Sequence, residues 1–351
     1  MVSTLNYDLA QEIYQSICVH SEEPGGMQVQ IVGKPGCGKT TVLMRTVPKL
    51  FYYNRADGTV QKETVIWRAR TPLDYWNYFL EPDFEWEDPK LQRPVHVFRH
   101  EDDKCSFQDE GGHAPDILIH EYKDTRELIG SFVKGAINVV YEPREHYFSS
   151  DFIQLVRGRG MKRFRELEDP VDGSKLWYEL FYYLLRSDRQ EFITIVMDEA
   201  DEVFHANPIG VDWHLHIFVM NSVRDFRKAG ISFLLTYHTY GDIDWMITTK
   251  IGVVGWMKGR PAPGWSQTSH YYARGGFHNL AVGEVIWESH GFGNHRFAPI
   301  KYRKRVLKIE RERPKNPDGR PRLTDRPARI EEEPPVHEDA PGASDLSVPV
   351  G

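Results

Sequence analysis

The sequence predicts an α/β fold in which a mostly parallel β-sheet carries helices on both faces. Short apolar runs rich in β-branched residues recur along the chain and alternate with segments of helical spacing. One run, residues 192–197, is apolar almost throughout and is followed by two carboxylates, which is typical of a strand buried on both faces. With 351 residues, of which 40% are hydrophobic and 13% aromatic, the chain can build a sizeable core in one large domain with a tail, or in two domains.

The first half of the chain supplies strands, helices and one irregular stretch. Apolar residues at 9, 10, 13, 14 and 17 predict a helix over residues 6–18. Thr71 and Pro72 are typical of a helix start, as N-cap and first residue. Residues 81–116 are irregular and acidic, so we expect an insertion there, with a short strand at 95–100 inside it. The remaining predictions are strands at 27–32, 63–70, 117–122 and 136–141, and helices from 41 and over 125–133.

The second half continues the alternation and then changes to a hairpin. Residues 148–188 are mostly helical with a break near Asp169 and Pro170, and the piece at 176–185 is apolar on nearly all sides and should be buried. Residues 282–288 and 296–300 flank a glycine-containing turn, which predicts a β-hairpin. The other expected elements are strands at 192–199, 231–238 and 251–257, a helix over 214–228 ended by Gly230, and a short helix over 242–249.

The composition changes near residue 301. Residues 301–329 hold 12 Lys and Arg against 4 Asp and Glu, whereas residues 331–351 hold 6 acids and no Lys or Arg. Proline is frequent in both parts, so we expect a disordered tail over 301–351 that is basic first and acidic afterwards. The basic part is either a nucleic-acid or protein contact or a solvated segment that pairs with its own acidic end. Residues 1–300 are then the folded domain.

A glycine-rich stretch between the strand at 27–32 and the next helix fits the pattern G-x-x-x-x-G-K-[ST] of a phosphate-binding loop. Glycines let its backbone N–H groups approach an anion, and the helix that follows adds a positive amino end. Lys39 is expected to reach the β- and γ-phosphates, Thr40 to ligate Mg²⁺, and Thr41 to support the α-phosphate side. The residues of the loop are Gly33, Lys34, Pro35, Gly36, Cys37, Gly38, Lys39, Thr40 and Thr41.

The two carboxylates after the apolar run at 192–197 complete the expected site. Asp198 would hold the Mg²⁺ shell and Glu199 would polarise the attacking water as general base. Loop and acidic strand end together predict a P-loop NTPase with a RecA/AAA-like sheet that hydrolyses ATP. The letters Asp198-Glu199-Ala200-Asp201 also match a helicase signature, but too little chain follows for a second RecA-like domain and no Ser-Ala-Thr motif is present.

A family resemblance is carried by four short motifs between residues 27 and 300. Residues 227–238, in which an arginine and Gly230-Ile231 precede a strand that ends in a polar residue, resemble FtsK/HerA-type ATPases, and so does the hairpin from Gly283. The resemblance implies that His238 senses nucleotide, although the family usually has Gln there. It also implies that Arg227 acts on the nucleotide of a neighbouring subunit, with Arg224 and Arg260 as rivals.

These ATPases are ring-forming DNA motors, and viral genome-packaging ATPases belong with them. The resemblance therefore implies a homo-oligomer, a hexameric ring, that translocates or packages DNA. Two other hypotheses stay open: an assembly ATPase or switch that acts on a protein partner through the tail or the insertion, and a nucleotide-binding regulator with little turnover. The expected nucleotide is ATP; the sequence does not establish ATP over GTP, although the GTPase base-recognition motif Asn-Lys-x-Asp is absent.

Composition excludes several other classes of protein. Cys18, Cys37 and Cys105 are too few for a disulfide framework, which favours a reducing, cytoplasmic location. No apolar run reaches the roughly 18 residues that a membrane helix needs, and no signal peptide is recognised. The net charge of −7 argues against bulk nucleic-acid binding but allows a local basic patch. Histidines between 96 and 120 match no zinc spacing, and the aromatic residues at 67–79 are expected in the core.

Overall fold

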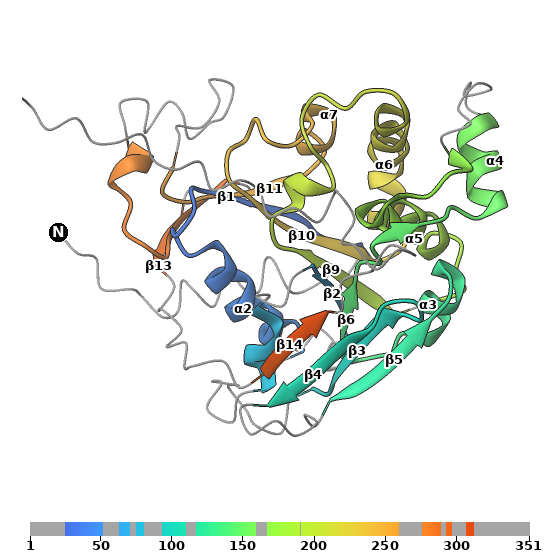
Figure 1. Ribbon diagram of the computed structural model, residues 1–351. Coiled ribbons are helices and arrows are strands. Elements are labelled where there is room, and N and C mark those ends of the chain that lie inside the picture. The colour runs from blue at the N-terminus through green and yellow to red at the C-terminus, as the bar shows by residue number, and fades with distance from the viewer. Residues whose placement is uncertain are drawn as a thin grey trace, which may run out of the picture. The chain divides into compact units, whose positions relative to one another are not determined.

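The computed structural model describes residues 25–51, 63–70, 75–80, 93–109, 117–158, 167–189, 191–259, 276–288, 293–296 and 307–311. These residues belong to one unit of the chain, residues 1–311, whereas residues 312–351 form a second unit that lies outside the described residues. Figure 1 shows the described elements in sequence colours. No helix in them is both long and apolar enough to span a membrane.

A ten-stranded sheet forms the centre of the unit. Its parallel strands are β1 (Gln28–Val32), β2 (Glu63–Ala69), β3 (Val95–His100), β5 (Leu118–Tyr122), β6 (Ile137–Tyr141), β9 (Phe192–Met197), β10 (Ile231–Tyr237) and β11 (Val253–Trp256). The antiparallel hairpin β12 (Glu284–Glu288) and β13 (Gly293–Arg296) closes one edge; the sequence predicts this hairpin, but its second strand begins three residues before the expected start at 296. The order is β13-β12-β11-β1-β10-β9-β2-β6-β3-β5, so β10 lies between β1 and β9.

Helices cover both faces of this sheet. One face packs on α2 (Lys39–Leu50) and the 3₁₀ helix η1 (Tyr75–Leu80), and the other on α3 (Thr125–Ser131), α4 (Ser150–Gly158), α5 (Leu176–Leu184) and α6 (Val211–Lys228). Figure 1 shows α2 across the sheet from α5 and α6. Side chains on a strand alternate between the faces: Ile195 and Met197 join one core, and Val196 the other. Both faces are dry, which explains the unbroken apolar runs in the sequence.

Two aromatic predictions are confirmed. Helix α5 is buried along nearly its whole length, including Trp177 and Phe181. Trp67 on β2 and Trp76 on η1 are core residues with exposed fractions of 1% and 0%, whereas Tyr75 is exposed. The remaining short elements of the described segments are α7 (Trp245–Thr248), η4 (Gly173–Lys175), η5 (Ala200–Glu202), η6 (Gly276–Asn279) and the strand pair β7 (Glu145–His146) with β8 (Val171–Asp172).

The structure differs from the sequence predictions at two places. Strand β3 pairs with β6 and β5, so this part of the expected insertion at 81–116 belongs to the main sheet. Strand β14 (Leu307–Arg311) lies in the expected disordered tail, yet it pairs antiparallel with β4 (Cys105–Asp109). In both cases strand pairing supplies the hydrogen bonds, and distant pairing cannot be seen in local composition.

Several predicted elements have shifted ends or lie outside the described residues. Helix α6 begins at Val211 and α7 at Trp245, three residues before and three after the expected starts, and β9 ends at Met197, two residues before its expected end. The expected helix from Thr71 starts among residues outside the description, and the described part of it, η1, is 3₁₀. The helix at 6–18, Arg260 and most of the tail also lie outside the described residues.

Candidate functional site

The site lies where β1, β10 and β9 end. Because these strands are parallel neighbours, the segments that follow them meet at one edge of the sheet. The glycine-rich loop follows β1, His238 follows β10, and Asp198 and Glu199 follow β9. Ligands of open α/β sheets bind at this carboxyl edge.

The loop after β1 is fixed by backbone contacts on both sides. The Gly33 N–H donates to the Tyr237 carbonyl at 3.2 Å, and the Lys34 N–H donates to the Lys258 carbonyl at 2.8 Å. Gly36 and Gly38 have φ angles of 74° and 99°, which favour glycine. Helix α2 starts directly after Gly38, and no side chain caps it. Its first N–H groups therefore face the loop, ready to bind an anion.

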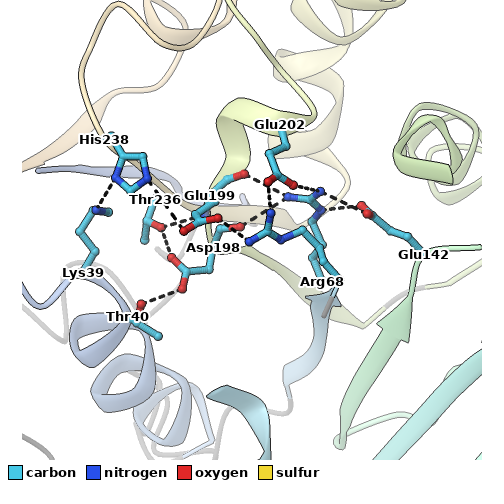
Figure 2. A network of polar contacts seen from close by, with 10 residues as sticks. Lys39, Thr40, Arg68, Glu142, Asp198, Glu199, Glu202, Thr236 and His238 are labelled. Carbon is cyan, nitrogen blue, oxygen red and sulfur yellow. Dashed lines mark hydrogen bonds and ion pairs between the residues drawn. The ribbon is translucent and has the colours of Figure 1, made fainter. Parts of the chain in front are cut away.

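The next two residues point from the helix start into the site (Figure 2). The Lys39 ammonium donates to the Gly33 carbonyl at 2.7 Å and lies 3.0 Å from Nδ1 of His238. The Thr40 hydroxyl donates to Oδ2 of Asp198 at 2.7 Å. Two motifs 158 residues apart in the sequence thus meet through one hydrogen bond. The loop, the start of α2 and the acidic end of β9 therefore form one polar site.

The chain was compared with protein-family models, with curated proteins and with solved structures. No protein-family model matches the sequence, and no curated protein matches it. Solved structures do match. One is B204, the DNA-packaging ATPase of Sulfolobus turreted icosahedral virus, with 12% identity, 78% of this chain and 98% of that chain covered, and a TM-score of 0.37.

Two further matches are ATPases 2 and 3 of EssC from Geobacillus thermodenitrificans and the N-terminal domain of zonular occludens toxin from Neisseria meningitidis. For EssC the identity is 14%, the coverage 78% of this chain and 39% of that chain, and the TM-score 0.30. For the toxin the values are 10%, 79%, 96% and 0.32.

Glu199 has an unusual backbone conformation. Its φ and ψ are both 54°, in the left-handed region that residues other than glycine rarely adopt. The Glu199 N–H donates to the Thr236 hydroxyl at 3.2 Å, and that hydroxyl donates to Oδ1 of Asp198. The Glu199 side chain is 39% exposed, with one oxygen bound by Arg70 and the other 3.9 Å from Nε2 of His238. Strained backbone held by its surroundings is a feature of functional sites.

Sequence reasoning missed the polar residues around this turn. Arg68 and Arg70 on and after β2 bind the turn after β9, and Glu142 after β6 binds Arg68. Thr236 on β10 and Glu202 on η5 complete the group. One signal was available, since a charge inside an apolar run, as in Val65-Ile66-Trp67-Arg68, must be paired when the strand is buried.

The electrostatics of the turn depend on burial and on its carboxylates. Burial acts to lower the pKa of Arg70, but Glu202 and Glu199 outweigh it and raise this pKa above its usual value. Burial raises the pKa of Asp201 in the same turn.

In the loop after β1, burial also raises the pKa of the Cys37 thiol. Cys37 is buried against Met257, with its sulfur 4.0 Å from Sδ of Met257, so it packs beneath the loop as a small apolar side chain.

Arg227 lies away from this cluster. It belongs to the last turn of α6, and its carbonyl accepts the Gly26 N–H at 2.7 Å, at the amino end of β1. Its own phosphate-binding loop is at the opposite end of the same strand. The side chains of Arg227 and Arg224 are both exposed.

The donors at the site suit magnesium. Thr40 and Asp198 offer a hydroxyl and a carboxylate in contact with each other, and Mg²⁺ prefers a few such oxygens together with phosphates and water. Among the described residues no group of three or more His, Cys, Asp or Glu could hold a metal ion. A site that is completed by a nucleotide's own phosphates fits this sparse set of protein ligands.

Proposed function

We propose that this chain is a Mg²⁺-dependent ATP hydrolase. The observation that carries the proposal is the contact of Thr40 with Asp198, because it joins the phosphate-binding loop to the acidic end of β9. Lys39, His238 and Glu199 continue from this contact as one network (Figure 2). Phosphate binding and water activation are thereby assembled at one place.

Each residue has a defined task in this proposal. The loop N–H groups and the start of α2 bind the phosphates, and Lys39 turns from the Gly33 carbonyl toward the β- and γ-phosphates. Thr40 and Asp198 hold Mg²⁺, which when bound offsets negative charge on the phosphate oxygens. Glu199 accepts a proton from the attacking water. Its carboxylate is partly exposed, so water can reach it, and it lies 3.9 Å from Nε2 of His238.

His238 and Arg227 have supporting roles in the proposal. His238 lies between the Lys39 ammonium and the Glu199 carboxylate. When Lys39 moves toward the phosphates, its contact with His238 changes, and so does the position of His238 relative to Glu199. This supports a sensing role for His238. Arg227 is exposed at the other end of the sheet, which suits an arginine that a neighbouring subunit supplies in trans.

We further propose that hydrolysis drives a hexameric ring that moves DNA. Support comes from the resemblance of residues 227–238 to FtsK/HerA-type motors and from the basic segment at 301–329. An ATPase acting on a protein partner is the second candidate. The exposed side chains of Ile209 and Trp245, on segments that follow β9 and β10, favour it. A cytoplasmic location stays a prediction.

Phosphate release from ATP, with and without double-stranded DNA, tests these proposals. Wild-type turnover that rises with DNA and is lost in Glu199→Gln supports the DNA motor. Turnover that needs Glu199 but ignores DNA supports the protein-directed ATPase. Absence of Mg²⁺-dependent turnover in the wild type, under conditions where the protein binds ATP, would overturn the assignment as a hydrolase.

A further inference from the structure

The buried arginine of β2 has contacts that the proposed chemistry does not use. Arg68 is 1% exposed in its side chain and lies at the carboxyl end of β2, next to β9. Its Nη1 donates to the backbone carbonyl of Glu199 at 3.0 Å and lies 3.5 Å from that of Asp198. Arg68 therefore binds the main chain of the turn and not the side chain of Glu199.

The charge of Arg68 is balanced by two carboxylates. Glu142 accepts from Nε at 2.6 Å and from Nη2 at 3.2 Å, and Glu202 accepts from Nη2 at 3.1 Å. Trp177 on α5 donates its indole N–H to the same Glu142 at 2.7 Å. Figure 2 shows the guanidinium of Arg68 between Glu142 on one side and the turn at Glu199 and Glu202 on the other.

We infer that Arg68 is the positioning residue for the general base of the proposed reaction. Glu199 has a left-handed backbone, which persists only where surrounding contacts hold it. Arg68 supplies such a contact at the carbonyl of Glu199, and it fixes Glu202 at the other end of the same turn. The inference rests on the proposed function of Glu199.

Arg68 and Arg70 divide the work on this turn. Arg70, two residues further along the chain, binds the carboxylate oxygens of Glu199 and Glu202 and is 19% exposed. Arg68 binds the backbone carbonyl of Glu199, shares the Glu202 carboxylate with Arg70, and is buried from water. Loss of Arg68 should therefore change the direction in which Glu199 points, while Arg70, as a direct partner of the carboxylate, affects its charge.

The test is Arg68→Lys, in which the charge stays but the planar fork that reaches one carbonyl and two carboxylates is lost. We expect kcat for ATP to fall about 10-fold or more, as for loss of a buried charged hydrogen bond, with nucleotide affinity changed less than about twofold. Affinity is measured with a non-hydrolysable ATP analogue. An unchanged kcat in a folded variant would overturn the inference.

Arg189→Lys is the matched control. Arg189 is also largely buried, donates to the carbonyls of Ile129 and Phe132 at 2.7 and 3.1 Å, and is paired with Glu191. Like Arg68, Arg189 binds backbone carbonyls and a carboxylate, but these partners lie outside the turn after β9. Its replacement should therefore lower the melting temperature without lowering kcat. An equal loss of kcat in both variants would show a general structural effect and would contradict positioning by Arg68.

A double-mutant cycle with Glu199→Gln separates positioning from other roles. If Arg68 acts through Glu199, Arg68→Lys should cost less than about twofold in single-turnover rate once Glu199 is Gln. Additive losses would overturn the inference while the proposed function stands. Full activity of Glu199→Gln alone would instead remove the proposed role of Glu199.

Trp177→Phe keeps the test decisive if Arg68→Lys does not fold. It removes one hydrogen bond to Glu142 and retains an aromatic ring in the core. A smaller loss of kcat, about two- to fivefold, with unchanged analogue affinity is expected, because Trp177 supports Arg68 only through Glu142, which keeps its ion pair with Arg68. No loss of kcat in this variant would contradict the network that holds Arg68.

Discussion

Glu199 and Glu179 are two carboxylates in polar networks of the same unit, but they are bound in different ways. The side chain of Glu179 on α5 is 2% exposed and accepts from the Thr125 hydroxyl at 2.7 Å, from the Ser149 N–H at 2.8 Å and from His146 at 2.8 Å. The side chain of Glu199 is 39% exposed, and within the described residues only one of its oxygens is in a hydrogen bond to a side chain, that of Arg70.

The difference indicates which carboxylate is available for chemistry. Both oxygens of Glu179 are used to join α3, β7 and α5, so this group holds elements together. Glu199 has one oxygen 3.9 Å from Nε2 of His238 in a partly exposed side chain, and its backbone is in the left-handed region. A buried carboxylate with both oxygens in hydrogen bonds stabilises the fold, whereas the partly exposed carboxylate of Glu199 suits the general base that we propose.

The largest expected effect is that of Glu199→Gln on hydrolysis. General-base catalysis contributes about 10²–10⁴-fold, so single-turnover hydrolysis of ATP should fall by about that factor. The free energy of unfolding should change by less than about 1 kcal/mol, since the ion pair with Arg70 is half-exposed. Rapid-quench kinetics and urea unfolding measure the two quantities. A loss of unfolding free energy as large as the one expected below for Glu179→Gln would contradict the difference between the two carboxylates.

Glu179→Gln is expected to show the opposite pattern. An amide at this position places N–H groups against donors, which costs about 1–3 kcal/mol of unfolding free energy. The hydrolysis rate per folded molecule should stay at the wild-type value because no contact of Glu179 reaches the site. Urea unfolding and active-site titration check this prediction, and a tenfold loss of rate in the folded protein would contradict it.

The smallest effect is a pH dependence of stability. Burial raises the pKa of Glu179, but hydrogen bonds from His146, Ser149 and Thr125 outweigh it and lower the pKa below 4.5. The unfolded chain then binds the proton first as pH falls, so this stabilisation is complete above about pH 4.5 and is lost through the lowered pKa. Urea unfolding between pH 3 and 6 should show a steeper acid loss for wild type than for Glu179→Gln. Equal slopes would show that Glu179 does not titrate in this range.

The sequence predicted the parts of the site that are adjacent along the chain. Lys39 and Thr40 follow from the spacing of one motif, and Asp198 and Glu199 from the end of one apolar run. The neighbouring position of His238 required β10 to lie beside β9, and the sheet order confirms it. The roles of these residues in catalysis stay predictions.

The residues that sequence reasoning missed come together only through strand order. Arg68 contacts Glu199 and Glu142 because β2 lies between β9 and β6 in the sheet. Along the chain, Glu199 is 131 residues and Glu142 is 74 residues from Arg68. Local patterns carry no information on which strands pair. For the same reason β3 was expected in an insertion, although it lies inside the sheet.

The pairing of β14 with β4 has a practical consequence for shortened versions of the protein. A chain that ends at residue 300, where composition suggests the domain stops, would lack the strand that pairs with Cys105–Asp109. The backbone donors and acceptors of β4 on that side would then be open to strands of other molecules. We therefore expect a chain ending at residue 300 to aggregate during purification, and one ending after Arg311 to remain dispersed.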